Sequence, residues 1–226
     1  MKLFWQGFRA IIPLWAGVVP FGMAYAVLAR SSGLSLWETQ LMSVIVFAGS
    51  SQFSAAGLFG LGASSLSIIL TTFVINMRHF LYTLTLGQAM NLSWSQKLIA
   101  AHLTTDEAFG VTLAHKQLNF PFFMGTALSL FLSWNVSTLA GSLLSEAVPD
   151  PEALGIDFIF PIAFLALLIP LLKTRKDLGV ALVSGVAAFT LSLYLSSGLT
   201  ILFTGVAGAL LGAWWTRDDV TLEENP

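Results

Sequence analysis

A group of polar side chains interrupts the long apolar run over residues 64–90. Asn76, His79 and Tyr82 are spaced three residues apart, which places them near one face of a helix, and Arg78 lies four residues before Tyr82. A guanidinium can bind a carboxylate with two parallel hydrogen bonds, and an imidazole changes its charge near physiological pH. These side chains are therefore candidates for binding an anion or for carrying a proton.

A second polar group follows in the shorter apolar run over residues 98–114, which contains Asp106 and Glu107. Ionisable groups inside a bilayer cost several kcal/mol unless they are paired or hydrated. Because consecutive spans are antiparallel, we expect Arg78 or His79 to face one of these carboxylates. Such a cluster is either a structural ion pair that orders two helices or a site for substrate or protons.

The stretch Phe47-Ala48-Gly49-Ser50-Ser51-Gln52-Phe53 places a glycine and three polar residues halfway along another apolar run. This pattern predicts an interrupted helix, which a membrane tolerates only inside protein or beside a water-filled cavity. The amide groups of a half-helix can bind a carboxylate, and opposing carbonyl groups can bind an ammonium. The stretch therefore suits a zwitterionic amino acid. Alternatively, its small residues only let helices pack closely.

The composition places these groups in a membrane protein. Hydrophobic residues make up 56% of the 226 residues and charged residues only 10%, and mean hydropathy is +0.81, whereas soluble domains are about 25% charged. This excludes a soluble enzyme and a disordered scaffold, and a net charge of −2 gives no reason to expect nucleic acid. Without cysteine there is no disulfide and no thiolate metal site.

The apolar runs predict an all-α, polytopic integral membrane helix bundle, with residues 1–226 as a single membrane domain. We expect about 7–8 transmembrane helices, the second of them interrupted, because a span needs about 20 apolar residues. A merged or re-entrant pair among the second to fourth would reduce the number to seven or six. The N-terminal run resembles a signal peptide, but it continues past the possible cleavage site, so we expect an uncleaved span. The predicted spans are 10–29, 39–62, 64–90, 98–114, 119–144, 158–172, 178–195 and 198–215.

The distribution of lysine and arginine predicts that both termini are cytoplasmic. With eight spans in this orientation, the outer loops contain only Arg30 and Lys97. The inner segments contain Lys2, Arg9, Lys116, Lys173, Arg175, Lys176 and Arg217. Residues 31–34 and 196–199 share the sequence Ser-Ser-Gly-Leu, which could mark an internal repeat but also matches by chance at a tight turn.

Several of these motifs together resemble the AzlC family of branched-chain amino acid exporters. They occur in order over roughly the first half of the chain, and beyond about residue 120 only the hydropathy is similar. Where the family often has Gly-Ser-Ala-Gln-Phe, this chain has Ser51 in the alanine position. The motifs are Pro20-Phe21-Gly22, Gly33-Leu34-Ser35, Met42-Ser43, Phe47 to Phe53, Asn76-Met77-Arg78-His79-Phe80-Leu81-Tyr82 and Thr105-Asp106-Glu107-Ala108-Phe109.

The resemblance implies export of leucine, isoleucine, valine and similar hydrophobic amino acids, including methionine, across the bacterial inner membrane. It also implies a small AzlD-type membrane subunit as partner and protons as the energy source. The chain has no Walker-type phosphate-binding loop, and we expect no cofactor, no metal and no catalytic residue.

Combined with the residue chemistry, the resemblance predicts a substrate site and a proton-coupling group. His79 and Asp106 are the expected coupling pair, with Glu107 beside them. The expected substrate-binding residues are Phe47, Gly49, Ser50, Ser51, Gln52, Phe53, Asn76 and Arg78.

Two other functions remain open from the sequence. One is a channel or a purely structural membrane subunit, which would tolerate loss of Asp106 or His79. The other is an intramembrane serine protease in which Ser50 or Ser51 pairs with His79, although no nucleophile-elbow pattern surrounds these serines.

Overall fold

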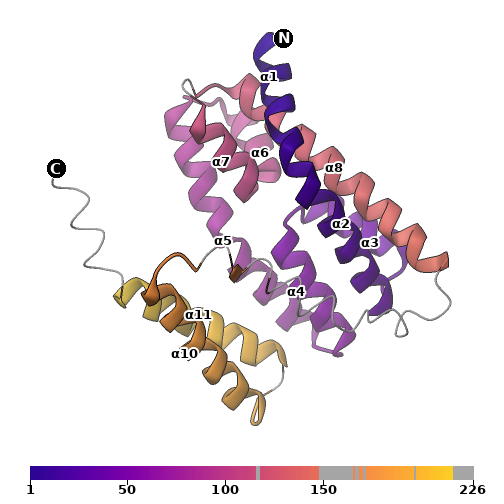
Figure 1. Cartoon of the computed structure of the whole chain (residues 1–226), viewed down its shortest axis with the longest axis vertical. Coiled ribbons are helices and arrows are strands. Elements are labelled where there is room, and N and C mark those ends of the chain that lie inside the picture. Colours follow the sequence, from indigo (N-terminus) through magenta and orange to yellow (C-terminus); the bar gives the residue numbers. More distant parts are fainter. Residues whose placement is uncertain (116–117, 148–164, 166–167, 170–171, 196, 216–226) are drawn as a thin grey trace.

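The computed structural model describes residues 1–115, 118–147, 165, 168–169, 172–195 and 197–215, and the regular elements in these ranges are all helical (Figure 1). The predicted all-α class is confirmed. The helices are α1 (Lys2–Ile11), η1 (Ile12–Leu14), α2 (Trp15–Ser31), α3 (Leu36–Ile45), α4 (Gly49–Gly60), α5 (Ser65–Ala89), α6 (Trp94–Leu103), α7 (Asp106–Ala114), α8 (Phe120–Ala147), α10 (Arg175–Ser192) and α11 (Ser197–Trp215).

By length and composition, two helical segments of the described part can cross a bilayer, Lys2–Ser31 and Phe120–Glu146. The first is continuous through α1, η1 and α2, with Pro13 in the tight 3₁₀ turn. Helix α5 has 25 residues, so it is about 37 Å long at 1.5 Å per residue. The predicted span 158–172 lies almost entirely outside the described residues.

Much of the surface is apolar, unlike that of a soluble protein, and the interior contains many hydroxyl groups beside an apolar core. On α5, Phe73 and Phe80 are 65% and 70% exposed. Helix α8 instead buries a row of small polar side chains against its neighbours, which is typical of helix packing in membranes. This row comprises Thr126, Ser129, Ser133, Ser137 and Ser142.

The α1–α2 segment and α8 pack closely and run in the same direction. Gly7 lies against the Phe122 backbone near the start of both segments, and Gly22 lies against Ser137 further along. At their ends, Arg30 donates to Glu146 across 2.9 Å. Arg30 is predicted to lie on the outer side, and the structure brings Glu146 to the same end of the bundle.

Helices α3 and α4 form a hairpin that enters and leaves the bundle at this same end. A Cβ on Gly60 would lie 2.9 Å from the Ser32 hydroxyl, and one on Gly33 would lie 3.8 Å from the Phe59 ring. The segment predicted as the second span is therefore a helical hairpin whose start and finish lie at the same end of the bundle. Its interruption is confirmed, but it falls at Val46–Ala48, and Phe47 has a φ of 28°.

The sequence predicted that the polar residues after Ala48 would themselves be the break. In the structure they form the first turn of α4. The Ser51 hydroxyl donates to the Ala48 carbonyl at 2.9 Å, and the Ala48 amide donates to Gln52 Oε1 at 3.3 Å. A helix N-terminus lacks acceptors for its amide groups, and the Gln52 side chain supplies one of them to Ala48. The polarity of these residues therefore marks a helix start.

Helices α6 and α7 form a second hairpin, so the prediction of one continuous span over 98–114 is wrong. The Thr104 hydroxyl donates to the Ala100 carbonyl at 2.6 Å and closes α6, and Thr105 caps α7 by accepting from the Ala108 amide. Two adjacent threonines thus end one helix and begin the next. The backbone of both threonines is extended, so α6 and α7 are separate helices.

The second hairpin enters from the end of the bundle opposite to the first (Figure 1). Helix α7 leads back toward the start of α8, where the Thr112 and Thr126 hydroxyls are 3.3 Å apart. Helix α5 links the two hairpins by running from one end of the bundle to the other. The chain up to α7 therefore consists of two units. In the first, the α1–α2 segment is followed by the α3–α4 hairpin, and in the second, α5 is followed by the α6–α7 hairpin in the inverted orientation.

The two units match at their turns, with an offset of 58 residues. Gly33 and Asn91 both have positive φ, 96° and 50°, and the next residue in each unit is a buried leucine, Leu34 or Leu92. Ser35 and Ser93 then open α3 and α6 with capping boxes, and both helices have 10 residues. The Ser-Ser-Gly-Leu turn at 31–34 thus has its structural counterpart at 89–92, whereas the sequence suggested 196–199.

Helices α10 and α11 form an antiparallel pair beside α5. Gly179 lies against the Trp215 ring, and Gly208 lies against Ser184. Helix α11 contacts α5, and the pair lies apart from the α1–α2 and α8 packing (Figure 1). The cavity described below is formed without these two helices.

The contact between α1 and α8 gives a test of the fold. A Cβ on Gly125 would overlap the Phe4 carbonyl oxygen, so we expect Gly125→Ala to destabilise the protein by about 1–3 kcal/mol. Thermal unfolding of the detergent-purified protein measures this as a fall in Tm of about 2–4 °C per kcal/mol. Gly185→Ala is the control, because nothing lies within 4 Å of its Cβ position. Equal Tm values for the two variants would contradict this packing.

Candidate functional site

The tips of the two hairpins meet at a cavity of about 360 Å³ in the middle of the bundle. This volume lies at the lower end of the range for small-molecule sites, about 300–1,000 Å³. The hairpins contribute backbone and polar groups, α5 contributes two basic side chains, and η1, α2 and α8 contribute an apolar wall. The lining residues are Leu14, Gly17, Val18, Phe21, Phe47, Ala48, Gly49, Ser50, Arg78, His79, Thr105, Asp106, Glu107, Leu130 and Trp134.

Arg78 connects α5 to both hairpin tips. Its Nη2 donates to the Ser50 hydroxyl at 2.5 Å and forms an ion pair with Asp106 Oδ2 at 3.0 Å. The Arg78 and Asp106 side chains are 35% and 42% exposed, so the pair contributes at most about 1 kcal/mol to stability. Both charged groups remain accessible to a ligand in the cavity.

Aromatic contacts place α7 against α5. The Tyr82 and Phe109 rings stack at 4.4 Å with an interplanar angle of 16°, and the His79 ring lies 6.0 Å from Tyr82. His79 lines the same cavity as Asp106. The ion pair joins Asp106 to Arg78, however, whereas His79 was the partner expected for proton coupling.

The apolar wall opposite the charges contains Trp134 from α8. Its indole Nε1 donates to Gln52 Oε1 at 3.0 Å, the same oxygen that accepts from the Ala48 amide. Phe53 lies behind this wall, with its ring 5.0 Å from that of Phe21. The first turn of α4 is thereby fixed to α8 and α2.

The structure brings together seven of the eleven predicted site residues. Asn76 is outside the cavity, and its side-chain oxygen has no hydrogen-bond partner in the described part of the chain. Three others, Ser51, Gln52 and Phe53, are fully buried behind the cavity wall. The residues that line the cavity are Phe47, Gly49, Ser50, Arg78, His79, Asp106 and Glu107.

The sequence reasoning missed the apolar wall. It treated the span over 119–144 as an ordinary hydrophobic helix, yet Leu130 and Trp134 from this helix line the cavity. A usable signal was present, because Trp134 lies midway along the span and tryptophan in membrane helices is usually enriched at the interfaces. Phe21 was noted only as part of a motif.

The contacts of the two serines disfavour the serine protease hypothesis. The Ser50 hydroxyl is hydrogen-bonded to Arg78, and the buried Ser51 hydroxyl donates to the Ala48 carbonyl. A nucleophilic serine needs a hydrogen bond to its general base. Neither serine is hydrogen-bonded to His79 in the part of the chain that the structure describes.

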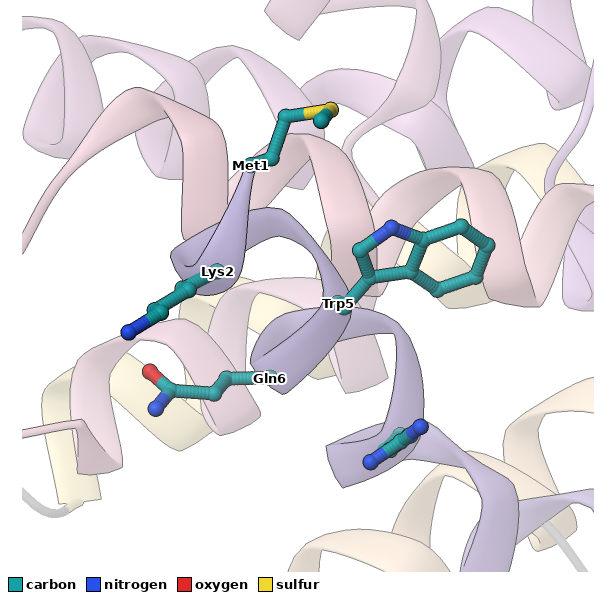
Figure 2. Close-up of a pocket in the computed structure, with 5 residues that line it drawn as sticks. Met1, Lys2, Trp5 and Gln6 are labelled. Atoms are coloured by element: carbon teal, nitrogen blue, oxygen red, sulfur yellow. The ribbon is translucent and has the colours of Figure 1, made fainter.

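A second hollow, of about 370 Å³, lies at the start of α1. Figure 2 shows that its labelled side chains come from the start of this one helix, with Lys2 and Gln6 on one side and Trp5 on the other. No second element fixes their geometry, so we assign it no site. It is lined by Met1, Lys2, Trp5, Gln6 and Arg9.

The fold and the cavity together define a helical membrane protein whose polar site is enclosed between two inverted hairpins. Residues 13–148 match the model of the AzlC protein family, which is more than half of the chain. The chain belongs to the AzlC family. The matched residues include every residue of the cavity.

Relatives extend this similarity over nearly the whole chain. An uncharacterised membrane protein of Archaeoglobus fulgidus is 30% identical over 94% of this chain and 95% of its own. The inner membrane protein YgaZ of Escherichia coli is 28% identical over 94% and 91%. The branched-chain amino acid transport protein AzlC of Bacillus subtilis is 28% identical over 73% and 68%. No solved structure matches.

Two substitutions compare how much the buried hydrogen bonds of Gln52 and the accessible ion pair of Asp106 contribute to stability. Gln52→Leu leaves the Trp134 indole and the Ala48 amide without their shared acceptor, which we expect to cost about 1–3 kcal/mol for each buried group. Asp106→Asn removes a half-exposed pair and should change stability by less than about 1 kcal/mol. Thermal unfolding of both purified variants tests this order, and a larger loss for Asp106→Asn would contradict it.

Proposed function

We propose that the protein is a secondary active exporter of branched-chain and similar hydrophobic amino acids. The observation that supports this most directly is the cavity itself, which combines the Arg78–Asp106 pair with an apolar wall. An amino acid with an aliphatic side chain has the complementary arrangement, two opposite charges at one end and an apolar group at the other. The name of the Bacillus subtilis relative agrees with this substrate class.

In the proposed complex, the substrate carboxylate binds Arg78 and the amides at the start of α4. A guanidinium suits this role because it can donate two parallel hydrogen bonds, and the N-terminus of a helix favours an anion. The substrate ammonium binds Glu107, which also lines the cavity. Its side chain lies against the apolar wall formed by residues of α2 and α8.

Competition for Arg78 provides a route to proton coupling. A bound carboxylate displaces Asp106 from the guanidinium, and a carboxylate without a cationic partner in the membrane binds a proton more readily. His79 lines the same cavity and is the residue that we propose to exchange this proton. Substrate and proton binding then depend on each other through one ion pair.

The inverted hairpins supply the elements for alternating access. In many transporters the substrate site lies between inverted repeats, beside half-helices that end at the site. Here α4 and α7 both begin at the cavity, and their hairpins enter from opposite ends. We propose that the two hairpins open the cavity in turn to either side of the membrane.

The cellular setting is part of the same proposal. We place the protein in the bacterial inner membrane with cytoplasmic termini and an outward direction of transport. A small AzlD-type membrane subunit is the proposed partner. Arg30 and Glu146, which pair at one end of the bundle, then lie on the outer side.

Efflux of preloaded labelled leucine, valine and methionine tests this function in cells that express the chain with the small partner. We expect faster efflux than in empty cells and a loss of this difference with a protonophore. Arg78→Gln and Asp106→Asn each remove a charged hydrogen-bond partner, worth about 1.5–3 kcal/mol, so efflux should fall about tenfold or more. His79→Ala should slow efflux and reduce its response to the protonophore.

The matched control is Asp177→Asn, the same change at the exposed start of α10, far from the cavity lining. This variant should export at the wild-type rate. Equal efflux from Asp106→Asn and wild type would refute the site assignment but not the function. Wild-type efflux no faster than in empty cells, with both proteins in the membrane, would favour a structural subunit.

The role of Arg78 has a separate test with purified protein. Leucinamide lacks the carboxylate of leucine, so we expect wild-type protein to bind leucine at least about tenfold more tightly, the loss of one charge-assisted contact. Arg78→Gln should bind both compounds with similar, weak affinity. Competition with labelled leucine measures these affinities, and unchanged discrimination in Arg78→Gln would exclude Arg78 as the carboxylate ligand.

A further inference from the structure

We infer that Trp134 sets the size of the substrate side chain that the cavity accepts, and that Gly49 provides the space for its ring. This inference rests on the proposed function and adds a specificity-determining residue to it. It starts from a contact between two helices that lie 85 positions apart in the sequence, α4 at Gly49 and α8 at Trp134.

The Trp134 ring is held in place on several sides. Its Nε1 donates to the buried Gln52 side chain at 3.0 Å, and its face stacks on Tyr25 at 6.1 Å with an interplanar angle of 20°. Tyr25 is fixed in turn, because its hydroxyl donates to the Thr39 carbonyl at 3.2 Å. The ring therefore cannot turn aside for a larger substrate without breaking buried contacts.

The edge of this ring closes the cavity toward the start of α4. A Cβ on Gly49 would lie 3.0 Å from Cη2 of Trp134, which is closer than ordinary van der Waals contact. A Cβ at position 49 would press on the ring edge, and both residues line the cavity. The distance between the charged groups and the ring edge thus limits the length of an aliphatic side chain.

An aromatic contact also fixes the tip of the first hairpin against α8. Phe47, at the tip of the first hairpin, has its ring 4.9 Å from that of Phe131, a residue of α8. Helix α8 therefore fixes the position of Trp134 relative to the tip of the first hairpin. In an apolar pocket of fixed shape, one methylene more or less changes selectivity by about 10–200-fold.

Two substitutions should shift the substrate preference in opposite directions. Trp134→Leu enlarges the cavity and should raise the affinity of phenylalanine relative to valine by about tenfold. Gly49→Ala adds a methyl group at the ring edge and should lower the affinity of leucine and methionine relative to valine. A loss of stability alone would weaken all substrates together, so opposite shifts report on the shape of the cavity.

The experiment measures competition by valine, leucine, methionine and phenylalanine against labelled leucine, for binding to the purified protein. Trp134→Leu leaves the Gln52 oxygen without its indole donor. Trp134→Phe loses the same donor but keeps a ring in the cavity, so it is measured beside Trp134→Leu and should shift the preference less. Trp37→Leu is the matched control, because this tryptophan on α3 is 74% exposed and lies outside the cavity. It should keep the wild-type order.

The outcomes separate this inference from the function on which it rests. Opposite shifts in Trp134→Leu and Gly49→Ala, with an unchanged order in Trp37→Leu, support the size limit. If wild type binds leucine but both cavity variants weaken all four amino acids by the same factor, Trp134 only stabilises the fold and the inference is wrong. If wild type binds none of them, the proposed function fails first and the inference fails with it.

Discussion

A single guanidinium group connects the parts of this molecule that form the site. Arg78 lies in the long helix α5 and contacts Ser50 at the tip of one hairpin and Asp106 at the tip of the other. A charge inside a membrane protein needs partners or water, and here its partners come from segments that enter from opposite ends. Arg78 therefore contacts both hairpin tips at the cavity, and it stays accessible to a ligand there.

The α1–α2 segment and α8 pack in parallel and form the rigid part of the bundle beside Arg78, which we call the frame. Glycines at Gly7, Gly22 and Gly125 allow backbones to approach, and buried hydroxyl groups on α8 complete the contact. Close packing of small residues is the main attraction between helices in lipid, where apolar side chains gain little by leaving the solvent. The frame is therefore rigid where the hairpin tips rest on it, and Trp134 belongs to this rigid surface.

Local patterns were sufficient to find most of the polar residues that line the cavity but not their geometry. The polar groups in the runs over 64–90 and 98–114 were correctly recognised as neighbours, because an unpaired charge in a bilayer is too costly to leave alone. The choice between Arg78 and His79 as the partner of Asp106 could not be made, since adjacent residues on a helix point in directions about 100° apart. Ser51 and Gln52 were placed in the cavity because polarity alone does not distinguish a ligand from a cap.

The sequence by itself determined that this is an all-α membrane protein, where α5 lies, and which charged side chains require partners, because composition and hydrophobic periodicity act locally along the chain. Only the tertiary structure decided that two apolar runs turn back as hairpins, since a re-entrant hairpin and a crossing helix have the same hydropathy. It also decided that Trp134 closes the cavity against Gly49, because a contact between segments so distant in sequence depends on how helices pack.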